Sequence, residues 1–127
     1  MVSFEDFRPA DGVPIYLQIL TYIKRGAIAG RIHDGDELPS RRVLSALLGV
    51  NPNTVQKAFR MLEDEGLIES RTGAKSCMTL TEDTLHALRA ELLSEEFRSI
   101  ARTLRQMGIT KDEALRLIAQ HWEEDGP

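Results

Sequence analysis

The sequence is poor in the features that mark secreted and membrane-embedded proteins. It holds one cysteine, Cys77, in 127 residues, so no disulfide can form within the chain. No apolar run approaches the roughly 18 residues that a membrane span needs. The start, MVSFEDFRPADG, is acidic and mixed, unlike a secretory signal. We therefore expect a cytoplasmic protein.

Motifs for catalysis and for cofactor binding are also missing. His33, His86 and His121 are dispersed and share no metal-ligand spacing with Cys77. There is no glycine-rich phosphate loop and no serine-nucleophile motif. A lone cysteine is more often a small apolar residue than a redox-sensitive thiol. We expect no enzyme activity, no cofactor and no metal.

An excess of positive charge is absent as well, because the formal net charge is -4. Taken alone, this value argues mildly against a nucleic-acid-binding protein. Between Leu38 and Leu62, however, every charged residue is basic, namely Arg41, Arg42, Lys57 and Arg60. This distribution is compatible with phosphate contact at one face. The alternative is a chance cluster of four charges.

The first part of the chain predicts an arm and a helix. Residues 1–13 have the composition of an extended arm, and Pro14 suits a helix start because its missing N–H costs nothing there. Gly30 is a plausible end of this helix, which should run to about Ala29. The residues that recur at helical spacing along it are Ile15, Ile19, Tyr22, Ile23 and Ala27.

Two further helices follow a turn-rich loop, HDGDELP. Ser40 is the expected N-cap of the first, Gly49 ends it, and its apolar side is formed by Leu44, Leu47 and Leu48. Asn51 is a good N-cap and Pro52 a good first residue for the second, which should span residues 52–65 and end at Gly66. The spacing predicts a buried stripe on this helix, made of Val55, Ala58, Phe59 and Leu62.

The segment LIESRTGAKSCMTL has apolar ends around a polar centre that contains a glycine. This pattern predicts a two-stranded hairpin with its tip near Thr72 to Lys75. Three helices and a hairpin in this order predict a winged helix-turn-helix.

From Thr81 onward the pattern changes to long amphipathic helices. Gly108 separates them, and Thr110 with Glu113 predicts a capping box at the second. Such helices cannot form a core alone, so we expect them to pair with a second subunit. The alternative is a monomer in which they fold back onto their own winged helix. We therefore divide the chain into residues 1–80 and 81–127, and expect dimerisation through Leu85, Leu88, Leu92, Phe97, Ile100, Leu104, Leu115, Ile118 and Trp122.

The helix that starts at Pro52 carries the side chains best suited to read DNA. With its stripe buried, the outer positions of its first turns hold Asn53, Thr54, Gln56, Lys57 and Arg60. Asn and Gln pair with adenine, and Arg and Lys with guanine or phosphate. The alternative is an ordinary solvated helix face, but such a face usually mixes acids with bases, and here no acid occurs before Glu63.

The stretch GDELPSRRVLSALLGVNPNTVQKAFRMLEDEGLIESRTG resembles the DNA-binding domain of GntR-family bacterial transcription regulators. The segments PIYLQI (14–19) and NPNT (51–54), and the short two-helix C-terminal part, resemble the YtrA-type subfamily. The resemblance covers residues 14 to about 76 closely and the remainder by architecture.

The resemblance implies a set of DNA-binding residues. They are Ser40, Arg41 and Arg42 at the LPSxR element, Asn51, Asn53, Thr54, Gln56, Lys57 and Arg60 on the recognition helix, and Arg71, Thr72, Gly73 and Lys75 on the wing. The wing departs from the family's RRGKGTFV pattern: Lys75 replaces a glycine and Cys77 an aromatic residue. A glycine at the tip lets the backbone enter the minor groove closely, whereas Lys75 is able to reach a phosphate instead.

These observations together predict a homodimeric winged-helix repressor that binds a palindromic DNA operator. The resemblance implies repression rather than activation, with a membrane-transporter operon among the regulated genes. One alternative is a switch that senses a small effector, with its site at the helical dimer interface, since the C-terminal part is too short for a large pocket in one subunit. Another is a winged helix used for protein contact only.

Overall fold

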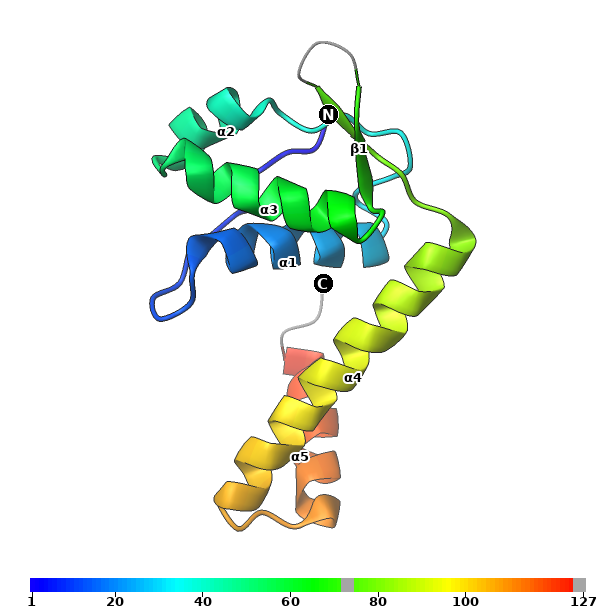
Figure 1. Ribbon diagram of the computed structural model, residues 1–127. Coiled ribbons are helices and arrows are strands. Elements are labelled where there is room, and N and C mark those ends of the chain that lie inside the picture. The colour runs from blue at the N-terminus through cyan, green and yellow to red at the C-terminus, as the bar shows by residue number, and fades with distance from the viewer. Residues whose placement is uncertain (72–74, 125–127) are drawn as a thin grey trace. The chain divides into compact units, whose positions relative to one another are not determined.

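The computed structural model describes residues 1–71 and 75–124 and contains the helices and the hairpin that the sequence predicts (Figure 1). The chain forms two compact units, Met1–Arg89 and the part from Ala90 onward. The elements, in order, are α1 (Ile15–Ile28), α2 (Arg41–Leu48), α3 (Pro52–Asp64), β1 (Ile68–Ser70), β2 (Ser76–Met78), α4 (Glu82–Gln106) and α5 (Lys111–Glu124). The fold class is therefore confirmed as a winged helix-turn-helix followed by a helical C-terminal element.

Helix α1 follows the predicted periodicity and packs against α3. Ile19 and Ile23 are fully buried. Pro14 stands one residue outside the helix, as its N-cap with ψ of 137°, and not at the first helical position. Gly30, just past the end, adopts a φ of +78°, the left-handed conformation that glycine tolerates.

Helix α2 begins and ends as predicted, but one of its apolar residues faces outward. The Val43 N–H donates to Ser40 Oγ (3.1 Å), and Gly49 is left-handed at the end. The prediction that Leu47 belongs to the buried side is wrong, because its exposed fraction is 67%. Ser45 takes that place: it is buried, and its hydroxyl donates to the Val50 carbonyl.

Helix α3 is positioned by the stripe that the sequence predicts. The four residues of the stripe have exposed fractions of 0–1%: Val55, Ala58, Phe59 and Leu62. Burying one large apolar side chain stabilises the fold by about 1.5–3 kcal/mol, so the stripe determines the rotation of the helix. Pro52 is the first helical residue, as predicted.

The wing, which we define as residues 68–71 and 75–78, contains the antiparallel strands β1 and β2. Its register pairs Ile68 with Met78 and Ser70 with Ser76. The loop before α2 adds to its outer edge, since the Met78 N–H donates to the Asp36 carbonyl (2.8 Å). Cys77 is buried between them, so its thiol is a small apolar group in the core. The expected tip at residues 72–75 lies outside the described residues, apart from Lys75.

The N-terminal arm has no helix or strand, and it is packed against the N-terminal unit. The Phe4 ring stacks on Tyr22 at 5.0 Å between centroids, and the Phe7 ring meets Tyr22 edge-on at 5.4 Å. The Gln18 side chain accepts a hydrogen bond from the Ala10 N–H (2.7 Å) and donates to the Ala10 carbonyl (2.9 Å). The arm is therefore attached along its length by specific contacts.

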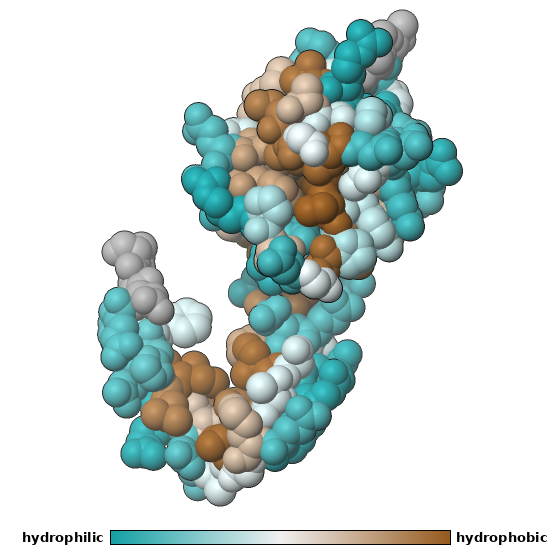
Figure 2. Space-filling view, turned by 90° about the vertical axis from the view of Figure 1, so that its left-hand side faces the viewer, coloured by the Kyte–Doolittle hydropathy of each residue, from teal (hydrophilic) through white to brown (hydrophobic). Residues whose placement is uncertain are grey.

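The C-terminal unit leaves much of its apolar surface exposed. Thr110 caps α5, as predicted, by accepting a hydrogen bond from the Glu113 N–H (3.2 Å). Figure 2 shows hydrophobic side chains gathered on the facing sides of α4 and α5 in this unit. The largest exposed apolar side chains here are Leu93, Phe97, Met107, Leu115, Ile118 and Trp122. No helix among the described residues is long and apolar enough to cross a membrane.

Candidate nucleic-acid interface

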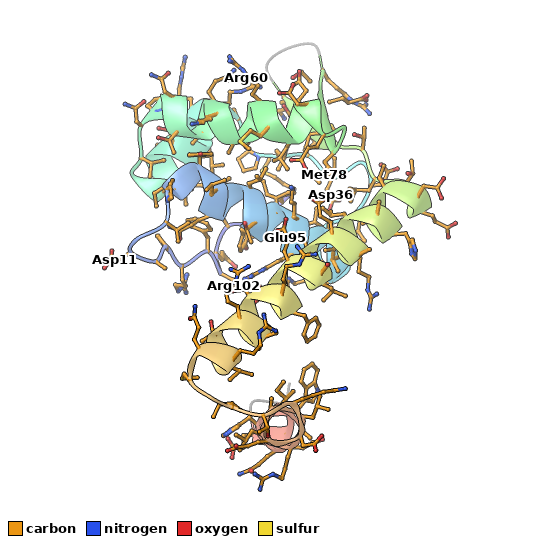
Figure 3. All side chains as sticks on the ribbon, turned by 60° about the horizontal axis from the view of Figure 1, so that its bottom comes forward. Asp11, Asp36, Arg60, Met78, Glu95 and Arg102 are labelled. Carbon is orange, nitrogen blue, oxygen red and sulfur yellow. The ribbon has the colours of Figure 1, made fainter. Side chains whose placement is uncertain are left out.

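The outer face of α3 presents a row of polar side chains along its whole length. Asn53, Lys57 and Arg60 are exposed, and Gln56 is half-buried beside them. Arg60 points away from the core in Figure 3. An open depression of about 430 Å³ runs along this face and is lined by Asn53, Gln56, Lys57, Arg60, Met61 and Asp64. The structure therefore brings four of the six predicted recognition-helix residues together on one surface, whereas Thr54, which is half-buried, does not line the depression.

The charge of this face changes along the helix. Lys57 and Arg60 make its first turns positive, and no acid lies among them. Asp64 lines the far end of the same depression. The positive charge therefore lies on the part of α3 before Met61, which includes the N-terminal turns, where a helix that enters the major groove places its base contacts.

Asn51 and Ser40 use their side chains as helix caps. Asn51 Oδ1 accepts a hydrogen bond from the Asn53 N–H (2.8 Å), and Ser40 Oγ does the same for the Val43 N–H (3.1 Å). A cap of this kind contributes about 1 kcal/mol to stability. Both residues therefore have a structural role, and the Asn51 amide group keeps its N–H donors for a ligand.

Arg41 and Arg42, adjacent in the sequence, have different environments. Arg42 is exposed at the start of α2. The Arg41 guanidinium lies 5.4 Å from the centroid of the Phe59 ring, and its buried Nε has no hydrogen-bond partner among the described residues. The structure thus leaves Arg42 as the freer of the two for a phosphate, and makes Arg41 part of the α2–α3 contact.

The cations of the wing are paired with acids at its surface. Arg71 lies 3.4 Å from Glu69, and Lys75 lies 3.4 Å from Glu37. All four side chains are about half exposed or more, so each pair contributes little to stability and can exchange its partner for a phosphate. The predicted wing contacts Thr72 and Gly73 lie outside the described residues.

Two contacts near α3 escaped the prediction from sequence. Lys24 of α1 is buried and its Nζ lies 2.8 Å from Glu65 Oε1, at the end of α3. Lys57 Nζ lies 4.0 Å from the centroid of the Tyr16 ring at the start of α1. Both pairs join positions far apart in the sequence. The position of Tyr16 in the first turn of an amphipathic helix is the one feature of the sequence that could have indicated a contact with a neighbouring helix.

The predicted dimerisation residues divide between the two units. Leu88 has an exposed fraction of 5% within one chain, so the prediction that it contacts a partner subunit needs correction: the first turns of α4 belong to the N-terminal unit and Leu88 completes its core. Leu85 and Leu92 are half-buried. Phe97 and Trp122 are 56% and 74% exposed.

The C-terminal unit holds an open hollow of about 440 Å³ between α4 and α5. Its lining is mainly apolar and includes Phe97, Ile100, Leu104, Ile109, Leu115 and Ile118. The expectation that this part is too short for a hollow of such volume within one chain was therefore wrong. The hollow lies between the two helices on either side of the turn at Gly108 and is open to solvent.

Known proteins resemble this chain in both sequence and structure. Residues 15–75 match the family described as bacterial regulatory proteins, gntR family. The chain is 31% identical to the uncharacterized HTH-type transcriptional regulator YhcF of Bacillus subtilis over 105 residues, which cover 83% of this chain and 87% of YhcF. It is 45% identical to the HTH-type transcriptional repressor YtrA of the same organism over 65 residues, covering 51% of this chain and 50% of YtrA.

A solved structure of a GntR family transcriptional regulator from Listeria monocytogenes is also similar. It superposes with a TM-score of 0.79 and 28% identity, covering 88% of this chain and 98% of that one. The similarity therefore extends past the winged helix into the C-terminal helices.

Proposed function

This chain belongs to the GntR family, as a YtrA-type helix-turn-helix transcription regulator that binds DNA, and we propose that it is a homodimeric repressor of a palindromic operator. Residues 1–80 bind the DNA and residues 81–127 join the subunits. The observation that carries the proposal is the outer face of α3, where four of the predicted contact residues line one surface.

Base reading is assigned to the N-terminal half of α3. Asn53 and Gln56 present amide groups, which pair bidentately with adenine in the major groove. The buried stripe holds the rotation of α3, so these side chains reach the groove without a rearrangement of the helix. Arg60 lies further along the same face and meets the edge of the groove.

Backbone contacts are assigned to the surfaces on either side of α3. Arg42 is exposed at the start of α2, and Lys75 lies on the wing in a weak surface pair. Such contacts position the protein on the duplex and carry no sequence information directly. The acidic net charge of the whole chain does not oppose this arrangement, because the potential near this face is set by local charges within about 10 Å.

The exposed apolar side chains of the C-terminal unit support dimerisation. Phe97, Leu115 and Trp122 are each more than half exposed in one chain, and a second copy would cover them. A two-fold dimer places its two α3 helices on half-sites about one helical turn apart, or a multiple of it. The similarity to a relative named a repressor supports repression.

The salt dependence of DNA affinity tests this proposal. The wild-type protein should bind random-sequence duplex at low salt, with log affinity falling linearly with log salt concentration. Arg42→Ala should weaken binding to all duplexes alike and reduce the slope by about 0.9 for each bound subunit. Affinity that is absent at low salt, or insensitive to salt, contradicts the proposal and favours a winged helix used for protein contact.

The hollow in the C-terminal unit supports a second role as an effector-sensing switch. Its volume of about 440 Å³ lies within the range of roughly 300–1,000 Å³ of small-molecule sites, and its lining is mainly apolar. A thermal-shift screen with apolar small molecules tests this role, since a bound effector raises Tm by mass action. The variant Leu104→Glu places a charge in the lining of the hollow and should abolish any such increase in Tm. An increase that is also seen with this variant would place the ligand elsewhere.

A further inference from the structure

Tyr16 and Lys57 meet where the start of α1 passes the start of α3. Lys57 Nζ lies 4.0 Å from the ring centroid, within the range of a cation–π interaction. Lys57 is exposed and Tyr16 is half-buried, so the pair lies at the surface. The two residues belong to helices that pack against each other, which keeps the ring in a constant position relative to α3.

The ring limits where the lysine can reach. A lysine side chain loses much rotamer freedom when it binds a phosphate, and the contact with Tyr16 removes part of that freedom beforehand. One side of the ammonium faces the ring, and the remaining N–H donors stay available. The Tyr16 hydroxyl, on the same ring, has no hydrogen-bond partner among the described residues. The ring therefore carries one donor, and the ammonium that contacts its face supplies others.

Lys57 and Gln56 are neighbours on the outer face of α3, and both line the depression there. Successive residues in a helix are about 100° apart, so the two side chains leave the helix in different directions. Lys57 contacts Tyr16 of α1. Gln56 remains a candidate for base reading.

We infer that Tyr16 is a positioning residue for DNA binding, and that its ring and hydroxyl form, with the Lys57 ammonium, a subsite for one backbone phosphate. The inference rests on the proposed function and deepens it. It makes Lys57 a backbone contact, separate from the base contacts of Asn53 and Gln56. The phosphate is held by the charged Lys57 ammonium and the neutral Tyr16 hydroxyl. Loss of the ammonium should therefore change the salt dependence of DNA affinity, whereas loss of the hydroxyl should not.

A double-mutant cycle on random-sequence duplex, followed by fluorescence anisotropy over a salt series, tests the subsite. Lys57→Met should lower the salt slope by about 0.9 for each bound subunit. Tyr16→Leu removes both the ring and the hydroxyl, so it should weaken binding about four- to fiftyfold when Lys57 is present, and should have a smaller effect in the Lys57→Met background. Tyr16→Phe keeps the ring, and should weaken binding about two- to tenfold with an unchanged slope. Lys111→Met, in the C-terminal unit, is the charge control and should bind like the wild type.

Several outcomes overturn the subsite. Additive losses in the double variant contradict the positioning role, and a Tyr16→Phe protein that binds like the wild type removes the hydroxyl contact. If Tyr16→Leu does not fold, as judged by circular dichroism, NMR of the wild type decides: the Lys57 Cε protons should be shifted upfield by the ring, and ordinary shifts overturn the inference. Wild-type binding with no effect of these variants overturns only the subsite, whereas absence of wild-type binding at low salt overturns the proposed function with it.

Discussion

At the scale of single residues, side chains in the candidate interface divide between holding the fold and contacting DNA. Asn51 and Asn53 show the difference, since they are two positions apart and of the same type. The Asn51 side chain caps α3 by accepting from the Asn53 N–H. The Asn53 side chain is exposed on the outer face of the helix. Their alanine variants should therefore affect different measurements.

Asn51→Ala should lower the free energy of unfolding by about 1 kcal/mol, because the cap is lost. Asn53→Ala, the matched control, should change it by less than about 0.5 kcal/mol, because an exposed helix position tolerates alanine. Urea unfolding measures both values, and DNA affinity should fall for Asn53→Ala in the fully folded protein. Equal stabilities of the two variants would contradict the capping role.

Gln56→Ala should change sequence preference more than total affinity. A bidentate amide contact discriminates against the wrong base by about 1–3 kcal/mol, so the loss should fall on one base pair of each half-site. Affinities for a set of operators with single base-pair changes measure this. A uniform loss over the whole set would place Gln56 at the backbone instead.

At the scale of elements, the orientation of α3 depends on packing and on one buried ion pair. The stripe on α3 determines its rotation, and Lys24 of α1 joins the end of α3 through Glu65 at 2.8 Å. Lys24 is 8% exposed, so its charge needs this partner. Removing the carboxylate would leave an ammonium buried without compensation.

Glu65→Ala should therefore destabilise the protein by about 1–3 kcal/mol, less than for a fully buried pair because Glu65 is partly exposed. Glu69→Ala is the matched control: its partner Arg71 is exposed, and such pairs contribute about 0–1 kcal/mol. Thermal or urea unfolding of both variants decides the point. Similar losses would mean that the buried pair has no special role.

Local patterns predicted where the helices begin and end, but could not predict every contact between them. Ser40, the Asn51–Pro52 pair and Gly49 act through neighbours a few residues away, so their roles were readable from sequence. Leu47 was misjudged because α2 is short, and its rotation is decided by contact with α3. The residues of the pairs Lys24–Glu65 and Tyr16–Lys57 are 41 positions apart in each case, so no local sequence pattern predicts that they meet.

At the scale of the whole molecule, the exposed apolar residues of the C-terminal unit have to be explained by something outside one chain. Trp122 is 74% exposed and Phe97 56%. Contiguous apolar surface of this kind marks an interaction site in water-soluble proteins. A second copy is the partner we propose, because two-fold symmetry also supplies the second α3 that an operator of two half-sites needs.

Phe97→Glu should convert the protein from dimer to monomer, because a charge would have to be buried at the contact. Light scattering should give twice the chain mass of 14.3 kDa for the wild type and the single mass for the variant. Glu95→Gln, an exposed change on the same helix, should remain dimeric. A monomeric wild type at micromolar concentration would contradict the proposed assembly.

Selection of bound duplexes from a random pool by the purified wild-type protein tests two parts of the proposed function together: base reading by α3 and the two-fold dimer. A homodimer that reads DNA through α3 should enrich an inverted repeat, with half-site centres about 10 base pairs apart or a multiple of it. Enrichment of a single unrepeated site would contradict the two-fold dimer. A pool that shows no enrichment after repeated rounds would contradict base reading by α3.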